Sequence, residues 1–137
     1  NEINTLPGYF PLFHDSNLQE IYKKNLKYTK NKSEELDHGG GSTDMGDLAH
    51  LMPVIHPYVG GATDASAHTA GFIVEDYELA VVEAGKMMAY TIIDLLYDEA
   101  STGKEVISKH NPRLTKNEYL KTMREFSNVE IANYNIK

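Results

Sequence analysis

The segment from about Asp76 to Tyr97 constrains the fold more than any other part of the chain. Its apolar residues recur at spacings of three and four, and Glu75 and Asp76 suit the positive end of a helix dipole. This pattern predicts the longest helix of the chain, deeply packed because apolar positions cover much of its circumference. We expect Gly85 to allow close packing there rather than to end the helix. The apolar positions include Leu79, Val82, Met87, Tyr90, Ile93 and Leu96.

The elements before this helix are shorter. Two prolines within residues 3–13 predict an edge strand or an extended connector. Asp15 or Ser16 can cap a helix over about residues 17–28.

A short helix, a short strand and a loop are predicted next. Residues 39–41 are a glycine run, followed by a short helix that Pro53 ends. The apolar run Val54–Val59 is bounded by Pro53 and Gly60 and predicts a buried strand. The small residues of 60–71 predict a loop.

The C-terminal part contains two further helix signals. Residues 104–109 predict a short helix, and Thr115 with Glu118 forms a capping box for a helix that ends near Phe126. Residues 128–137 are a polar tail. Together these elements predict a helix-rich chain with few strands.

Composition narrows the class of protein. The 137 residues allow one domain, and the formal net charge of −7 argues against nucleic acid as a partner. The absence of cysteine excludes disulfides and thiolate metal sites and is compatible with a cytoplasmic location. We expect no membrane span, because no apolar stretch approaches the roughly 20 residues that one requires. The chain opens on extended-looking sequence without a starting Met, which suggests a piece of something longer.

Most of the six histidines have a structural interpretation that does not involve a metal. His14 and His110 border loops and are expected to be solvated, whereas His56 is expected to be a satisfied core residue. His38 fits either interpretation. Asp47 and His50 share one helical face, a spacing that unrelated helices often show.

His68 is the strongest candidate for a metal ligand. It lies in a loop of small residues between the predicted strand and the longest helix. Loops that follow strand ends line the ligand crevice of open α/β sheets, and small residues leave room for a metal or substrate. Spacing alone gives a metal role and a structural role about equal weight.

The run from Gly40 to Gly61, GGSTDMGDLAHLMPVIHPYVGG, resembles a known catalytic segment. It is similar to the C-terminal part of the metallo-amidohydrolase family that includes aminobenzoyl-glutamate hydrolases, aminoacylases, bacterial zinc carboxypeptidases and auxin-conjugate hydrolases. Residues 6–12 and the helix over 76–96 also resemble this family. The resemblance covers about residues 5–119, and the aminobenzoyl-glutamate-hydrolase-like branch fits best.

The resemblance implies a domain plan. Residues 1–13 would be a connector from a lid domain, residues 14–127 the C-terminal part of a zinc-peptidase-like catalytic domain, and residues 128–137 a tail. In this family the lid domain usually dimerises and the catalytic domain, which is α/β, holds two divalent metal ions. The resemblance therefore implies an α/β fold, of which this chain would be the helix-rich C-terminal part with few strands. We therefore expect zinc or manganese as cofactors in the complete enzyme, and a homo-oligomer.

The resemblance also implies site residues. His68 matches the last metal ligand of the family, and Gly60 and Gly61 match a glycine pair lining the substrate cleft. Thr43 replaces an acidic residue, so only Asp44 is carried over, as a residue that supports the site without binding metal. The family's His-x-Asp segment, its bridging acid and its Glu-Glu pair all lie N-terminal to the lid domain, so the resemblance assigns no catalytic residue to this chain.

The predicted function is the C-terminal segment of a metal-dependent amidohydrolase, inactive alone, acting on an N-acyl amino acid or dipeptide-like substrate. The alternative is a non-catalytic helical interaction module that retains the ancestral sequence. A third, weaker possibility is a single-metal binder that uses His68 with His50 or Asp47.

Overall fold

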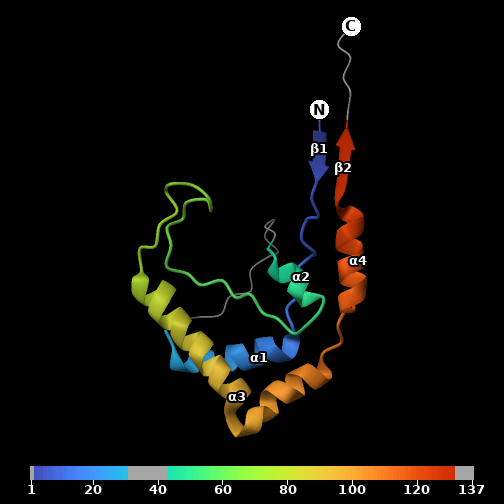
Figure 1. Ribbon diagram of the computed structural model, residues 1–137. Helices are drawn as coiled ribbons and strands as arrows, with labels where there is room; N and C mark the ends of the chain where they lie inside the picture. Colours follow the sequence, from blue (N-terminus) through green and yellow to red (C-terminus); the bar gives the residue numbers. More distant parts are fainter. Residues whose placement is uncertain (1, 31–42, 132–137) are drawn as a thin grey trace.

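The computed structural model describes residues 2–30 and 43–131, and helices dominate this part of the chain (Figure 1). The helical fraction is 53%, which confirms the expected helix-rich fold. In the described residues the one sheet consists of β1 (Glu2–Thr5) and β2 (Asn128–Ile131), paired antiparallel. A parallel sheet covered by helices does not occur in these ranges.

The first helix follows the predicted range. It comprises α1 (Ser16–Lys24) and a 3₁₀ extension, η1 (Asn25–Tyr28). Asp15 caps α1, because its Oδ1 accepts a hydrogen bond from the Leu18 N–H at 3.0 Å. Asn25 is buried, and its Nδ2 donates to Asp94 at 2.8 Å, which links η1 to the long helix α3 (Ala84–Lys109).

The short helix α2 (Met45–Ala49) also agrees with the sequence, whereas the buried strand predicted after it is wrong. Residues 53–61 have no regular secondary structure, and Val54 is buried but Tyr58 is 74% exposed. Pro53 and Pro57 have no N–H to donate, so this segment cannot complete a hydrogen-bonded ladder.

The long helix begins near its predicted start but does not run straight. It comprises a π-helical turn, η2 (Glu78–Glu83), and α3 (Ala84–Lys109), which merges two helical segments across a kink. Asp98, Glu99 and Ala100 have positive φ of 51°, 53° and 58°. This left-handed conformation costs roughly 1–2 kcal/mol per residue. The predicted short helix over 104–109 is therefore the second segment of α3.

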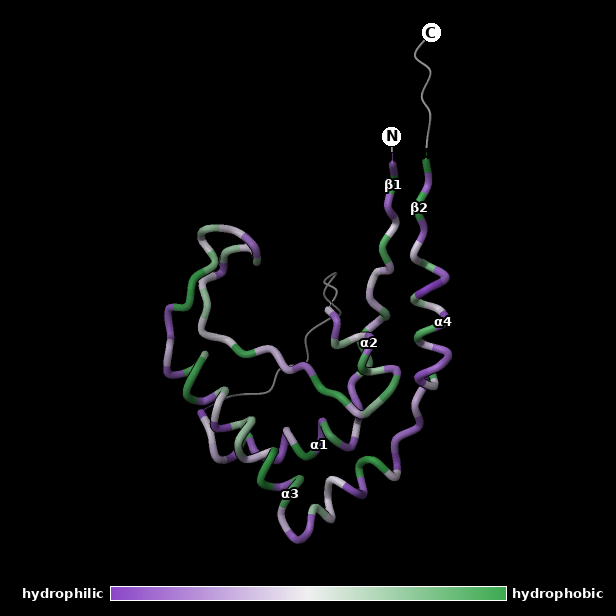
Figure 2. The backbone as a smooth tube through the Cα atoms, viewed as in Figure 1, coloured by the Kyte–Doolittle hydropathy of each residue, from purple (hydrophilic) through white to green (hydrophobic). Residues whose placement is uncertain are grey.

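The expectation of deep packing for the long helix is wrong. Met87 is fully buried, but Ile92, Ile93 and Leu96 are 51%, 57% and 65% exposed. No atom lies within 4 Å of a Cβ built at Gly85, so this glycine does not serve close packing. The elements are too few to cover the helix from all sides, and Figure 2 shows hydrophobic residues along it.

The accessible surface shows that the chain is open. It measures 10733 Å², whereas a compact chain of 15.4 kDa would expose about 7,200 Å². In Figure 1 the second segment of α3 turns back at the kink, and α4 (Lys116–Phe126) then rises toward β1. None of the helices in the described residues is long and apolar enough to cross a membrane.

The last helix has the predicted cap. Thr115 Oγ1 accepts from the Glu118 N–H, and the Glu118 carboxylate accepts from the Thr115 N–H at 2.7 Å. The first four residues of the predicted polar tail form β2 instead, paired with the N-terminal strand. The glycine run over 39–41 and His38 lie outside the described residues.

Candidate functional site

A loop between residues 60 and 76 carries His68, and its two limbs are joined by backbone hydrogen bonds. Ala62 pairs with Val74, and the Thr63 N–H donates to the Ile73 carbonyl at 3.0 Å. The Thr63 hydroxyl donates to the Gly71 carbonyl at 2.7 Å. The loop is therefore closed by its own residues, and in Figure 1 it projects from the N-terminal end of η2.

His68 lies at the tip of this loop with an exposed side chain. Its φ of 66° is in the left-handed region, which histidine adopts more readily than most non-glycine residues. Next to it, the Thr69 hydroxyl donates to the Ser66 carbonyl at 2.7 Å, and the Phe72 N–H donates to the Thr69 carbonyl at 3.1 Å. The fold thus holds the backbone around His68 and leaves the imidazole accessible to a ligand.

Gly60 and Gly61 lie at the base of the same loop. Gly61 has a φ of +104°, and a Cβ there would lie 2.7 Å from the Asp76 carbonyl oxygen. The Gly61 carbonyl accepts hydrogen bonds from the N–H groups of Glu75 and Asp76. Gly61 therefore has a structural reason to be glycine, whereas Gly60 is exposed and meets only the Leu79 side chain at 3.4 Å.

Asp44 is exposed and directly precedes α2. Its side chain makes no capping hydrogen bond to the helix, and Oδ1 accepts from the Thr43 hydroxyl at 3.2 Å. Figure 1 shows α2 and the loop over 60–76 as separate parts of the molecule. The structure therefore places Gly60 and Gly61 at the base and His68 at the tip of one loop, and it places Asp44 apart from them.

The Asp47–His50 pair on α2 holds segments of the fold together. The Asp47 carboxylate accepts from the Phe10 N–H at 2.8 Å and from the Tyr119 hydroxyl at 3.1 Å. Burial and the bond to Asp47 raise the pKa of Tyr119. His50 is 8% exposed, and its Nδ1 lies 2.9 Å from the Gly46 carbonyl oxygen, beneath the Phe10 ring. The spacing of three residues between Asp47 and His50 predicts that they share a helical face, but it does not predict the groups that they contact.

His110 is not the solvated residue that the sequence predicts. Its side chain is 15% exposed, and Nδ1 lies 3.1 Å from Oδ2 of Asp15, whose side chain is 7% exposed. Ninety-five positions separate these two residues, so no local pattern could predict this pair. Asp15, the N-cap of α1, thereby also attaches the end of α3 to the rest of the chain.

His14 and His56 also have surroundings that differ from those predicted. Desolvation and the charge of His56 lower the pKa of His14. His56 was expected to be a satisfied core residue, but its Nδ1 is buried without a hydrogen-bond partner. The His56 ring packs against Tyr58, at 5.3 Å between ring centroids, in a segment without regular secondary structure.

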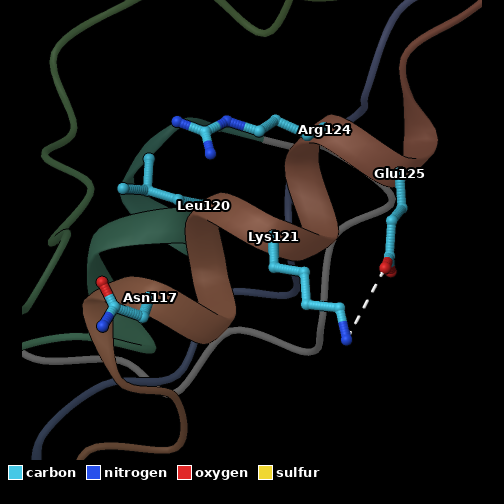
Figure 3. A pocket seen from close by; sticks show the side chains of 5 residues that line it. All are labelled: Asn117, Leu120, Lys121, Arg124 and Glu125. Carbon is cyan, nitrogen blue, oxygen red and sulfur yellow. Dashed lines mark ion pairs between the residues drawn. The ribbon is translucent and has the colours of Figure 1, made fainter.

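Two surface depressions lie away from His68. One of about 230 Å³ is lined by residues of the 13–17 loop and of the end of α3, including His14, His110 and Arg113. The other, of about 490 Å³, is lined entirely by α4 side chains (Figure 3). A single helix encloses no ligand, and its Lys121–Glu125 ion pair spans 3.8 Å in solvent. Neither depression includes a residue of the loop over 60–76.

The geometry allows His68 to act as one ligand of a larger centre. No group of three or more His, Asp or Glu side chains suited to a metal occurs within residues 2–30 and 43–131. An exposed imidazole on a braced loop can still provide one bond to a zinc or manganese ion whose other ligands come from elsewhere. Comparison with known proteins adds no assignment, because no protein-family model, curated protein or solved structure matches the chain.

Proposed function

We propose that the chain is the C-terminal segment of a metal-dependent amidohydrolase and contributes His68 to its metal centre. The observation that carries the proposal is the exposed imidazole on a loop of small residues whose limbs are hydrogen-bonded to each other. The hydrogen-bonded backbone and the small neighbours leave space beside the imidazole for an ion, and a left-handed residue in such a loop is a reason to test for function. The resemblance of residues 40–61 to the family supplies the reaction class.

In this proposal the described residues have three roles. His68 Nε2 or Nδ1 binds a metal, and Thr63 and Thr69 hold the loop that presents it. Gly60 lies exposed at the base of the loop, where the absence of a side chain leaves room for substrate. Asp44 lies apart from this loop, so a supporting role for it stays a prediction from the sequence.

Two divalent ions, zinc or manganese, would supply an activated water for attack on the amide of an N-acyl amino acid or dipeptide-like substrate. This chain lacks both the general base and the remaining ligands among its described residues. It therefore acts on an amide only as part of a complete catalytic domain in a cytoplasmic homo-oligomer, and the isolated chain is inactive.

The test uses the longest reading frame that contains this sequence. Upstream in-frame sequence with a His-x-Asp segment and a Glu-Glu pair supports the proposal. The purified product, supplied with zinc or manganese, should then hydrolyse an N-acyl amino acid. His68→Ala should abolish hydrolysis and lower the bound metal, whereas the matched variant His14→Ala, also an exposed histidine, should keep both.

The competing function is a helical interaction module, and one observation favours it. Large apolar side chains of α3 are exposed, as expected for a helix that docks on a partner. A reading frame without upstream catalytic motifs, together with a His68→Ala variant that binds the same amount of zinc as the wild type, would favour this function and contradict the proposed one.

A further inference from the structure

Three residues in the middle of α3 adopt a backbone conformation that L-amino acids avoid. Asp98, Glu99 and Ala100 all have positive φ, and three consecutive non-glycine residues in this region are strained. We call residues 97–100 the hinge and residues 101–131 the arm. The body comprises the described residues up to 96.

The hinge sequence does not itself require a bend. It reads Tyr-Asp-Glu-Ala, without glycine or proline, and Glu and Ala are strong helix formers. The segments on both sides are helical. The locally preferred conformation is therefore one uninterrupted helix over residues 84–109, about 39 Å long.

Contacts between the arm and the body hold the bend. β2 of the arm pairs with β1 of the body, with Val129 opposite Asn4. The Leu114 N–H donates to the His50 carbonyl at 3.0 Å, and Tyr119 donates to Asp47 at 3.1 Å. None of these contacts involves the hinge, so an identical arm from another molecule could make all of them.

Gly103 shows how tightly the bend is closed. A Cβ built there would lie 2.9 Å from the backbone oxygen of Leu95, eight positions earlier. In a straight helix these residues are more than two turns apart and do not meet. Gly103 is therefore compatible with both forms, whereas alanine fits only the straight one.

Straightening would also join apolar residues that the bend separates. Ile92 and Leu96 lie before the hinge and Ile107 after it, and they are 51%, 65% and 69% exposed. On a continuous helix these three, with Ala100 and Gly103, fall within about 80° of the circumference. Such a narrow stripe of apolar and small residues is suited to packing against an identical helix.

From these observations we infer that a second copy of this chain is the partner of the α3 surface, and that the two copies exchange arms. Each hinge straightens, each arm pairs with the body of the other molecule, and the two apolar stripes pack together. The exchange keeps the arm–body contacts, releases the hinge strain and covers exposed apolar surface. A strained hinge is the feature that favours this kind of two-fold dimer.

Two reciprocal substitutions test the role of the hinge by sedimentation over micromolar to submillimolar concentrations. Gly103→Ala, which closes off the bent form, should lower the dimer dissociation constant at least about tenfold. Ala100→Gly, which relieves the bent form, should raise it at least about tenfold. Gly85→Ala is the matched control, because it lies in α3 with no atom within 4 Å and should leave the constant unchanged.

A second measurement distinguishes arm exchange from face-to-face association and does not alter the hinge. The chain has no cysteine, so Asn4→Cys and Val129→Cys can be made in separate molecules, mixed, refolded together and oxidised. Arm exchange places the two thiols opposite each other across chains and yields a disulfide-linked heterodimer. A Gly103→Ala variant that stays monomeric throughout, or a dimer that yields no heterodimer disulfide, would overturn the inference.

Discussion

At the junction of residues 9–15, α2 and α4, polar side chains connect segments that are far apart in the sequence. In the loop over 60–76, hydroxyl and backbone groups connect only residues of the same loop. Asp47 is occupied on both oxygens by Phe10 and Tyr119, whereas the His68 imidazole is exposed. The comparison separates a polar side chain that stabilises the fold, Asp47, from an imidazole that is exposed to solvent.

The largest loss of stability is expected at Gly46, where the junction is most closely packed. A Cβ at Gly46 would collide with the Phe10 carbonyl oxygen, so Gly46→Ala must move backbone and should cost about 3 kcal/mol or more. Gly85→Ala is the control, with open space around it and a gain of about 0.5–1 kcal/mol. Urea unfolding of both variants measures the difference, and equal midpoints would show that the junction is not closely packed.

A smaller loss is expected from Asp47→Asn. The amide oxygen can accept from the Phe10 N–H and the amide N–H₂ can donate to the Tyr119 oxygen, but both hydrogen bonds lose the charge of the carboxylate, so we expect a cost of about 1 kcal/mol. The same substitution at exposed Asp44, one turn earlier, should change stability by less than about 0.5 kcal/mol. Chemical denaturation of the two variants compares them directly. A larger loss of stability for Asp44→Asn than for Asp47→Asn would contradict the role of Asp47 in holding the junction together.

The contacts of Glu83 at the end of η2 should differ from the His68 loop in the pH dependence of their contribution to stability. Buried Glu83 accepts from Lys86 at 2.6 Å and from the Lys30 N–H at 2.7 Å, and these bonds lower its pKa. The unfolded carboxylate has the higher pKa, so the stabilisation is present above that value and is lost as the pH falls through the folded pKa. The hydrogen bonds that close the His68 loop contain no group that titrates in this range.

Urea midpoints of the wild type and Glu83→Gln at several pH values between neutral and about pH 3 test this linkage. The variant should be less stable near neutral pH, and the difference should shrink in acid. Thr63→Val, which removes a hydroxyl that closes the loop, should show a difference that does not depend on pH. A Glu83→Gln difference that is constant across the range would exclude the proposed ion pair as its cause.

The smallest effect on stability is expected at His68. His68→Ala should change the free energy of unfolding by less than about 0.5 kcal/mol, because the side chain is exposed. His68→Gly should stabilise the chain by up to about 1 kcal/mol, since glycine adopts φ of 66° without strain. Thermal unfolding measures both. A loss above about 1 kcal/mol for His68→Ala would mean that the imidazole belongs to the fold.

The candidate site was predictable only in part. The loop of small residues and the position of His68 within it follow from the sequence, because both depend on neighbours within a few positions. The role of Asp47 and the Asp15–His110 pair did not follow, since their partners lie 37 to 95 positions away. Whether His68, Gly60 and Asp44 serve a metal and a substrate stays a prediction.

The structural features that the sequence alone determined in this protein depend on interactions between neighbouring residues. The Asp15 cap, the Thr115–Glu118 capping box and the short helix ended by Pro53 each need groups no more than a few residues apart, and all are present. These interactions close only short loops, so they form with little loss of chain entropy. They therefore need no contact with residues that are distant in the sequence.

Contacts between residues distant in the sequence determined the hinge in α3, the strand β2 and the exposure of the long helix. The hinge at 98–100 opposes the helical preference of its own residues, and β2 replaces a tail that reads as polar and irregular. The exposed face of α3 likewise contradicts the deep packing that its apolar pattern predicts. Periodicity shows which side of a helix prefers burial, but the cover depends on other elements being present and correctly placed, which no local pattern encodes.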